Sequence, residues 1–484
     1  MIQSSTWSTC IRVGVLGALS AMGHWHPSLW LVSFIALCGL IRTFNHSVSQ
    51  PLQAYSVGLS WGLGYYLFTC HWLITPLSTV AQLPSMLSYA LLLLFFLIMA
   101  QTIAFTLYCA HRFSQYVSHY TAITVSWVFM EWLLTQSTLS FPWALLGYAF
   151  VESPWAYCAP YGGVFMVSGV ILLSSIYLTQ PIHRIDQVLL KIFLILLLSF
   201  IPPLSYTHPT SNLSIKWVEG YRSPLEKWHP TQQFNALKYF IQQSPIETRP
   251  ALLIWPEGAL PWLYNTHNPD IQHLNHWIRT HNLNLITGIF NQEQNSFFNS
   301  ALFLTQHRSQ LIHKHFLVPL GEYWPLPSVV KHVLHDLSIP YAELSVGKNS
   351  PLIHFNGHTL LTLICYEIAF PQWIWTHSIQ SQASIVITDD SWFDSSIAIQ
   401  EHLNITRMRM LETQKPFAFV NDTGHSQILD ILPQANTPQR LTLRIGHTPV
   451  VQWGMVPMIV MLTIILLFEY LVPLNRRKDS SLSP

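Results

Sequence analysis

Three residues that could take part in catalysis follow short apolar runs in the second half of the chain. Glu257 comes after LLIWP, Lys314 after LIH and Cys365 after LLTLI. A cysteine attacks as its thiolate, and an ordinary thiol pKa of about 8.5 leaves little thiolate near neutral pH. A carboxylate within reach can accept the thiol proton, and a lysine can stabilise a developing oxyanion. These residue types together predict covalent catalysis by a cysteine.

Each of these residues also has an ordinary structural explanation. A free cysteine is most often a small buried apolar side chain, a carboxylate after a strand is usually solvated, and a lysine usually lies on the surface. Of the six cysteines, however, only Cys365 falls in the more polar region after residue 213, so it has no disulfide partner there. No Cys-x-x-Cys or His-Glu-x-x-His spacing indicates a metal site, and we expect neither a metal nor an organic cofactor.

The elements that must position these residues alternate between strands and helices, which predicts an α/β domain with a mixed sheet. We expect strands at 213–218, 251–255, 284–290, 300–305, 310–312, 352–355, 359–365, 384–388, 417–421, 426–432 and 441–445. We expect helices at 231–243, 268–281, 327–336, 371–380 and 397–413.

The chain as a whole is too apolar for a soluble protein. Charged residues make up 9% of the 484 residues, against about 25% in an ordinary soluble domain. The net charge of +1, with no basic run before Arg476, gives no indication of nucleic-acid binding. Apolar segments long enough to cross a membrane are expected at 9–22, 28–42, 55–76, 85–110, 119–136, 160–179, 187–205 and 450–473. The composition therefore predicts a polytopic α-helical membrane domain of about eight spans that carries one α/β domain.

The basic residues orient these spans. Arg12, Arg42, Arg112 and Arg184 fall on one side, whereas the opposite loops 76–84 and 137–159 hold no lysine or arginine. By the positive-inside rule both termini are cytoplasmic and the α/β domain lies across the membrane, in the periplasm of a bacterium. The predicted division is a membrane domain at 1–207, a catalytic domain at 213–447, a last span at 450–473 and a cytoplasmic tail at 474–484.

Two features of the membrane half could serve function. Glu131 lies near the outer end of its span, where an interfacial carboxylate costs less than one at the bilayer centre. The segment 137–163 is apolar but broken by prolines, which predicts an interfacial or re-entrant segment facing the α/β domain. Its aromatic residues could handle lipid or only anchor the protein.

Glu257, Lys314 and Cys365, in this order, resemble the Glu-Lys-Cys triad of the nitrilase superfamily. Several sequence segments are more specifically similar to one membrane-embedded branch of this superfamily, the apolipoprotein N-acyltransferase family. These segments are LLIWPEGALPW, HKHFLVPLGEYWPLP, LICYEIAFP, FFNSALFL, DDSWFDSS, FMEW and FPWALLGYAF. The resemblance covers essentially the whole chain and implies an αββα sandwich for the catalytic domain.

The resemblance also implies an activity. Cys365 would take the sn-1 acyl chain of a phospholipid, typically phosphatidylethanolamine, as a thioester, with Glu257 as general base and Lys314 as oxyanion partner. The chain would then pass to the α-amino group of the diacylglyceryl-cysteine that begins an apolipoprotein, the last step of lipoprotein maturation in the bacterial inner membrane. By motif position the supporting residues would be Glu322, Tyr366, Glu367, Trp228, Trp392 and Trp143. The family resemblance suggests a monomer.

Some residues depart from the family pattern. Asp389 and Asp390 stand where the family has Asn-Asp, Asp394 replaces a glycine, and Asp422 replaces an asparagine. These changes leave the triad intact but affect its neighbouring loops.

Two other functions remain open from the residues. A membrane-tethered carbon-nitrogen hydrolase would use water as second substrate, although it would need neither the spans nor the FPW loop. A transporter or lipid-binding protein with an idle nitrilase-like domain is opposed by the intact triad.

Overall fold

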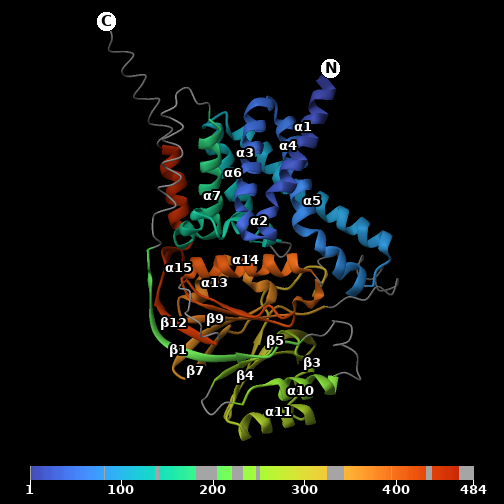
Figure 1. Cartoon of the computed structure of the whole chain (residues 1–484), viewed down its shortest axis with the longest axis vertical. Coiled ribbons are helices and arrows are strands. Elements are labelled where there is room, and N and C mark those ends of the chain that lie inside the picture. Colours follow the sequence, from blue (N-terminus) through green and yellow to red (C-terminus); the bar gives the residue numbers. More distant parts are fainter. Residues whose placement is uncertain are drawn as a thin grey trace.

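The computed structural model describes residues 2–80, 82–136, 141–180, 204–220, 233–246, 251–323, 343–393, 395–431 and 439–467. Long helices stand side by side at one end of the molecule, and two β-sheets with their flanking helices form the other (Figure 1). The predicted helix over 327–336, residues 187–203 of the predicted span over 187–205, and Trp228 lie outside the described residues.

The helical half contains long apolar helices joined by short turns. Its main members are α1 (Ile2–Ser20), α3 (Trp30–Ser47), α4 (Pro51–Cys70), α5 (Ser85–Phe113), α6 (His119–Leu133) and α7 (Ala159–Thr179). Among the described residues three helical segments are long and apolar enough to cross a membrane: Pro27–Ser47, Ser85–Phe113 and Pro154–Thr179. A further apolar helix, Val456–Leu467, packs through Met458 against glycines of α7. The class of membrane protein is confirmed, and the number of eight spans stays a prediction.

The second half is a sandwich of two sheets. Among the described strands the first sheet has the order β12-β1-β2-β4-β5-β6, with β3 beside β4, and the second has the order β11-β10-β9-β8-β7. The first sheet is built from β1 (Thr207–Trp217), β2 (Leu252–Ile254), β3 (Leu260–Leu263), β4 (Asn284–Glu293), β5 (Ser296–Leu304), β6 (Ser309–His313) and β12 (Arg440–Gly446). The second sheet is built from β7 (Leu352–Phe355), β8 (His358–Ile364), β9 (Ala383–Thr388), β10 (Phe417–Asn421) and β11 (Gln427–Leu429).

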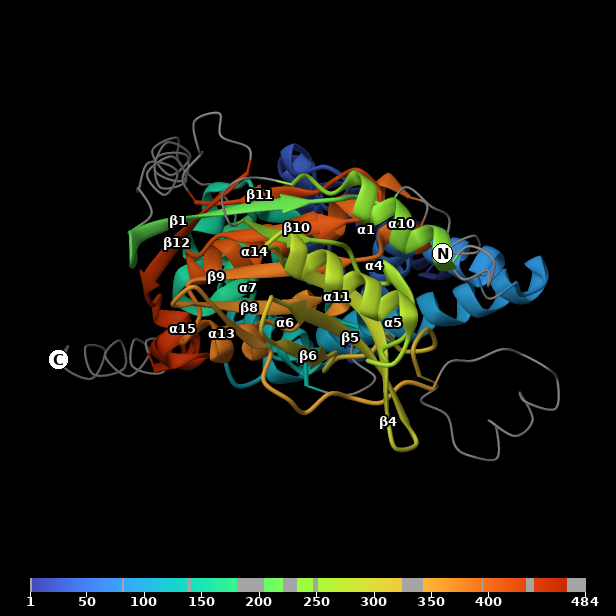
Figure 2. The ribbon, with the colours of Figure 1, turned by 90° about the horizontal axis from the view of Figure 1, so that it is seen from below.

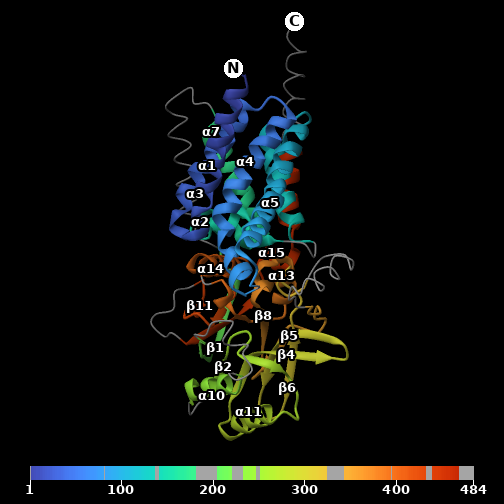
Figure 3. The same cartoon turned by 90° about the vertical axis from the view of Figure 1, so that its right-hand side faces the viewer.

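Helices cover the outer face of each sheet (Figure 1), and the view from below shows those in front of the first sheet (Figure 2). On the side away from the membrane helices, α10 (Gln233–Gln243) and α11 (Pro269–Thr280) cover the first sheet. On the other side, α13 (Pro371–Ser378) and α14 (Ser396–Thr413) lie between the second sheet and the helical half, as Figure 3 also shows. The layers are therefore helix, sheet, sheet and helix, which is the αββα sandwich that the family resemblance implies.

Strand directions explain where the reactive residues gather. The strands β8, β9 and β10 are parallel, and β2 and β4 are parallel in the first sheet. The strand β6 pairs antiparallel with β5, which pairs antiparallel with β4, so β2, β4 and β6 share one direction. Because the carboxyl ends of strands with one direction meet at one edge, polar residues after those ends come together.

Most of the predicted strands and helices of this half are found within a few residues of their expected ends. The short strand β3 had no prediction because Pro261 interrupts its apolar pattern. Cys365 was expected to end a strand at 359–365, but β8 ends at Ile364 and Cys365 begins a 3₁₀ turn, η8 (Cys365–Ala369).

Candidate active site

Glu257, Lys314 and Cys365 follow three different strands. Lys314 directly follows β6, Cys365 directly follows β8, and Glu257 lies three positions beyond β2. All three side chains belong to buried residues, with relative exposures of 7% for Glu257, 1% for Lys314 and 7% for Cys365. The two sheets thus bring a carboxylate, a cation and a thiol to one buried region.

A close approach of two backbones holds the Glu257 turn in place. A Cβ atom on Gly288 of β4 would lie 2.3 Å from the nitrogen of Gly258 and 2.6 Å from the Cα of Glu257. Gly258 itself has a φ of +61°, which most other residues avoid. Two glycines therefore let the Glu257 turn pack directly on β4.

The Lys314 ammonium is shared between two carboxylates. Its Nζ lies 3.1 Å from Oε1 of Glu257 and 2.9 Å from Oε1 of Glu322. Burial would lower the pKa of Lys314, but Glu257 and Glu322 outweigh it and raise the pKa above its ordinary value. The lysine is therefore a fixed positive charge at this site.

Glu257 is oriented by neighbours at both of its oxygens. Oε1 also accepts a hydrogen bond from Nδ2 of Asn299 at 2.7 Å, and Oε2 accepts one from the backbone N–H of Asp389 at 2.9 Å. The same Asn299 amide donates to Oε1 of Glu322 at 2.8 Å. Asn299 lies in FFNSALFL but had no assigned role in the sequence, because a single asparagine in a strand carries no recognisable spacing.

Cys365 is held in an unusual backbone conformation with a φ of +50°. Glu367 stabilises this turn, because its Oε2 accepts from the N–H of Ile364 at 2.7 Å. Its Oε1 accepts from the N–H of His315 at 2.6 Å, in the segment that follows Lys314. Glu367, 1% exposed, thus joins the cysteine turn of one sheet to the lysine strand of the other.

The surroundings of the Cys365 thiol favour its protonated form. Burial is the largest cause that raises its pKa, and the negative charge of Glu257 raises it further, while Lys314 and a hydrogen bond with Thr388 act in the opposite direction. The net pKa lies well above the ordinary thiol value, so the arrangement needs a base to take the proton.

Aromatic residues form one side of this site. The ring of Tyr366 stacks on that of Trp143 at a centroid distance of 6.1 Å and an interplanar angle of 18°. Trp143 belongs to η4 (Pro142–Ala144) of the helical half, so that half contributes directly to the neighbourhood of the cysteine. Trp392 lies half-buried in the turn η9 (Asp390–Trp392).

The residues that depart from the family pattern differ in their surroundings. Asp389 reaches Glu257 through its backbone, while its side chain accepts from the N–H of Ser391 at 3.3 Å, so a changed side chain leaves the Glu257 contact in place. Asp390 is fully buried and its Oδ1 lies 2.9 Å from Nδ1 of His402. Asp422 is buried beside Gly220, and Asp394 lies outside the described residues.

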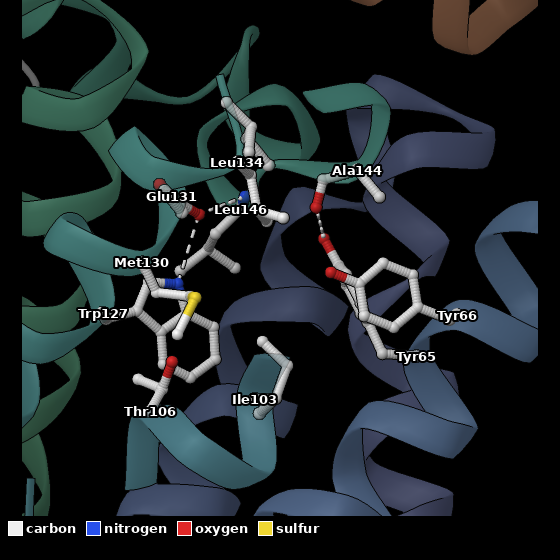
Figure 4. Close-up of a pocket in the computed structure, with 11 residues that line it drawn as sticks. Tyr65, Tyr66, Ile103, Thr106, Trp127, Met130, Glu131, Leu134, Ala144 and Leu146 are labelled. Atoms are coloured by element: carbon white, nitrogen blue, oxygen red, sulfur yellow. Dashed lines mark hydrogen bonds between the residues drawn. The ribbon is translucent and has the colours of Figure 1, made fainter. Parts of the chain in front are cut away.

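Glu131 lies near the end of its helix, as the sequence predicts, and other parts of the protein enclose it. It is 5% exposed, near the end of α6, and its Oε1 accepts from Nε1 of Trp127 at 3.1 Å and from the N–H of Leu146 at 2.7 Å (Figure 4). The segment containing Leu146 folds back over the end of α6 and covers the carboxylate, which periodicity along one helix does not predict.

Two family models match the two halves of the chain. The model described as carbon-nitrogen hydrolase matches residues 221–452, and the sandwich with its Glu, Lys and Cys cluster is of that class. The model described as apolipoprotein N-acyltransferase N-terminal domain matches residues 16–177. A CN-hydrolase superfamily protein from Xanthomonas campestris is 16% identical and covers 52% of this chain and 97% of its own at a TM-score of 0.34.

Whole-length relatives narrow the class to one family. A protein named apolipoprotein N-acyltransferase from Coxiella burnetii is 27% identical over 490 residues, covering 95% of this chain and 99% of its own. One of the same name from Haemophilus ducreyi is 27% identical and covers 94% of this chain and 95% of its own. The chain belongs to the apolipoprotein N-acyltransferase family.

Proposed function

We propose that this protein transfers an acyl chain from a membrane phospholipid, through a thioester on Cys365, to the α-amino group of the N-terminal diacylglyceryl-cysteine of apolipoproteins. The observation that carries the proposal is the extent of the relatives, which match both the helical half and the catalytic half under one name. A carbon-nitrogen hydrolase would account for residues 221–452 alone.

The first half-reaction loads the thiol. Glu257 accepts the proton of Cys365 as Sγ attacks the sn-1 ester carbonyl of the donor, and Lys314 stabilises the oxyanion that forms. When the carbon–oxygen bond breaks, the lysophospholipid leaves as an alcohol after taking the proton from Glu257. The acyl chain remains on Cys365 as a thioester.

The second half-reaction transfers the acyl chain from Cys365 to the acceptor. The α-amino group of the acceptor attacks the thioester, Glu257 takes a proton from the amine, and the thiolate leaves and is reprotonated. A thioester is activated enough for an amine to attack, so the cycle needs no cofactor.

The surrounding residues have supporting roles in this proposal. Glu322 and Asn299 orient Lys314 and Glu257, which is supported by their shared hydrogen bonds. Glu367 supports the cysteine turn. Tyr366, Trp143, Trp392 and Trp228 would contact the substrates.

The setting of the reaction is also part of the proposal. The protein would lie in the bacterial inner membrane as a monomer, with both termini cytoplasmic and the domain at 213–447 periplasmic. Phosphatidylethanolamine would be the main donor. The domain's position against the apolar helices supports a lipid donor, because Trp143 of the helical half stacks on Tyr366, the residue after Cys365.

The test is direct. Purified protein in detergent would receive a phospholipid labelled in its sn-1 acyl chain and then be denatured without reductant. We expect hydroxylamine-sensitive label on the protein, lost in Cys365→Ser, and transfer of that label to a diacylated peptide with a free amine. Release of the label only as free fatty acid, without a thioester, would support the hydrolase alternative, which the names of the relatives do not favour.

A further inference from the structure

The segment 141–150 of the helical half carries Trp143 and lies between the long helices and the sandwich. It consists of the short turns η4 (Pro142–Ala144) and η5 (Leu146–Phe150), in which every residue is buried. Short 3₁₀ turns leave many backbone groups without partners of their own, and buried polar groups need partners. Other elements must therefore hold this segment in place.

The helical half holds it from one side (Figure 4). The hydroxyl of Tyr65 donates to the carbonyl of Ala144 at 3.1 Å, and the N–H of Leu146 donates to Oε1 of Glu131 at 2.7 Å. The N–H of Gly147 donates to the hydroxyl of Ser168 at 3.0 Å. These contacts fix the backbone on either side of Ala144 but do not fix the indole of Trp143.

Glu401 of α14 holds that indole from the opposite side. Its Oε2 accepts a hydrogen bond from Nε1 of Trp143 at 2.8 Å and another from Nε1 of Trp72 at 3.0 Å. Glu401 is 1% exposed, and within the described part of the chain no cation lies within ion-pair distance of it. A single carboxyl oxygen thus fixes two indoles that come from separate segments of the helical half.

The two indoles belong to a cluster of aromatic rings that reaches the residue after the cysteine. Trp143 stacks on Tyr366, the residue after Cys365. The ring centroids of Trp72 and Phe393 are 4.6 Å apart. The ring centroids of Phe393 and Trp143 are 6.3 Å apart. An apolar surface of this kind suits a long acyl chain and gives little to a short one.

We propose that Glu401 is a positioning residue that fixes Trp72 and Trp143 as the wall against which the acyl chain of the donor binds at Cys365. This deepens the proposed function and rests on it. Glu401 does not touch the reacting atoms in this role. Burial raises the pKa of its carboxyl group, with the two indole hydrogen bonds opposing, so the site favours the neutral form of this acceptor.

The chemistry of this acceptor suggests a pair of variants. Glutamine is a close copy of a neutral glutamic acid, and its amide oxygen can accept both indole N–H groups, whereas leucine keeps the volume and loses the acceptor. A matched control is Glu152→Gln, which removes an exposed carboxylate that also faces α14, 3.4 Å from Arg407.

The experiment measures single-turnover thioester formation at Cys365 with two donors, a long-chain phospholipid in detergent and the soluble ester p-nitrophenyl acetate. For Glu401→Leu we expect thioester formation from phospholipid to be about tenfold slower at subsaturating donor concentration, mainly because the KM for phospholipid rises. The rate of thioester formation with the soluble ester should change little. Glu401→Gln and Glu152→Gln should remain close to the unmodified protein with both donors.

A double-mutant cycle tests whether the effect passes through the indole. Trp143→Phe keeps an aromatic ring but removes the N–H donor, so adding Glu401→Leu to it should cost less than Glu401→Leu alone costs. Near-ultraviolet circular dichroism should show weaker tryptophan signals in Glu401→Leu and not in Glu401→Gln.

Three results would overturn the positioning role. Equal losses for glutamine and leucine would mean that an ionised carboxylate is required, and equal losses with both donors would mean a general structural role. A rate for Glu401→Leu like that of the unmodified protein would also exclude it, while leaving the acyltransferase proposal intact. If the unmodified protein forms no thioester with phospholipid, both proposals fail.

Discussion

Two helices of the same sandwich, α11 and α14, are buried in different ways. The helix α11 has one apolar stripe, Ile271, Leu274, Trp277 and Ile278, which covers the first sheet, and its other side faces solvent. The helix α14 is buried nearly all round, and its buried residues include the ionisable Glu401, His402, Arg409 and Glu412.

The difference follows from what each helix contacts. A helix with one partner surface needs one apolar face, and α11 has a single sheet beneath it. The helix α14 lies between the second sheet and the helical half, so its polar side chains must find partners in that half. Glu412 accepts from the N–H of Val164 at 2.7 Å, and Asn404 donates to the carbonyl of His24 at 3.0 Å. Buried polarity on α14 thus specifies how the two halves fit together.

The Glu412 contact shows this fit in detail. Within α7 the helix is interrupted at Gly162 and Gly163, and Gly163 has a φ of +67°. A Cβ at Gly163 would lie 2.2 Å from the ring of Trp375. The break frees the N–H of Val164, and a carboxylate from α14 then caps the second part of α7, where the helix dipole favours negative charge.

The largest effect is expected when the Glu412 cluster is broken. Glu412→Leu leaves the N–H of Val164, the indole of Trp375 and the buried guanidinium of Arg409 without their carboxylate, which lies 2.7, 2.7 and 3.2 Å away respectively. Removing one member of a buried charge pair costs about 3–5 kcal/mol of the free energy of unfolding. Thermal unfolding in detergent would measure it. Glu412→Gln, which keeps an acceptor, should lose less, and equal losses would contradict the explanation.

An apolar truncation on α11 should cost somewhat less and act only locally. Leu274 is fully buried in the cluster between α11 and the first sheet. Leu274→Ala should lower the free energy of unfolding by about 3 kcal/mol, through lost apolar burial and the cavity left behind. Thioester formation by the folded protein should stay unchanged, because the site lies on the other side of that sheet. A specific loss of thioester formation would mean that the two helical layers are coupled.

The pH dependence of the free energy of unfolding should differ between the unmodified protein, which has the buried acid Glu401 on α14, and the variant Glu401→Gln, which has an amide there. Burial raises the pKa of Glu401 above its ordinary value of 4.5, so the folded protein keeps a proton that the unfolded chain releases. The stability that Glu401 contributes is full below pH 4.5 and is lost as the pH rises through the raised pKa. The free energy of unfolding of the unmodified protein should therefore fall, relative to that of Glu401→Gln, as the pH rises. A constant difference across this range would show that the carboxyl pKa is not raised.

The smallest effect is expected at the exposed edge of α14. Arg407 is paired with Glu152 at 3.4 Å, and their side chains are 27% and 48% exposed. Solvent screens such a pair, so Arg407→Ala should change the free energy of unfolding by less than about 1 kcal/mol. A loss as large as that of Glu412→Leu would show that position along α14, and not burial, sets the cost.

The sequence predicted the strands and helices of the catalytic half because their patterns are local. The run LLTLI reads as a buried strand whatever surrounds it, and β8 covers it. The roles of Asn299 and Glu401 could not be found in this way, because an amide in a strand and an acid in a helix give no local signal. Their meaning depends on partners 42 and 258 positions away in the chain, Glu257 and Trp143.

The amino-acid sequence by itself determined the membrane class and predicted the kind of chemistry. A cysteine, a glutamate and a lysine at three strand ends, with long apolar segments outside the domain, are properties of composition and order. The tertiary structure alone decided which residues surround the thiol, because packing joins the segments that follow β6 and β8 through Glu367 and brings Trp143 from the helical half onto Tyr366. Hydrophobic periodicity specifies which face of an element is buried, and three-dimensional packing determines which partner covers that face.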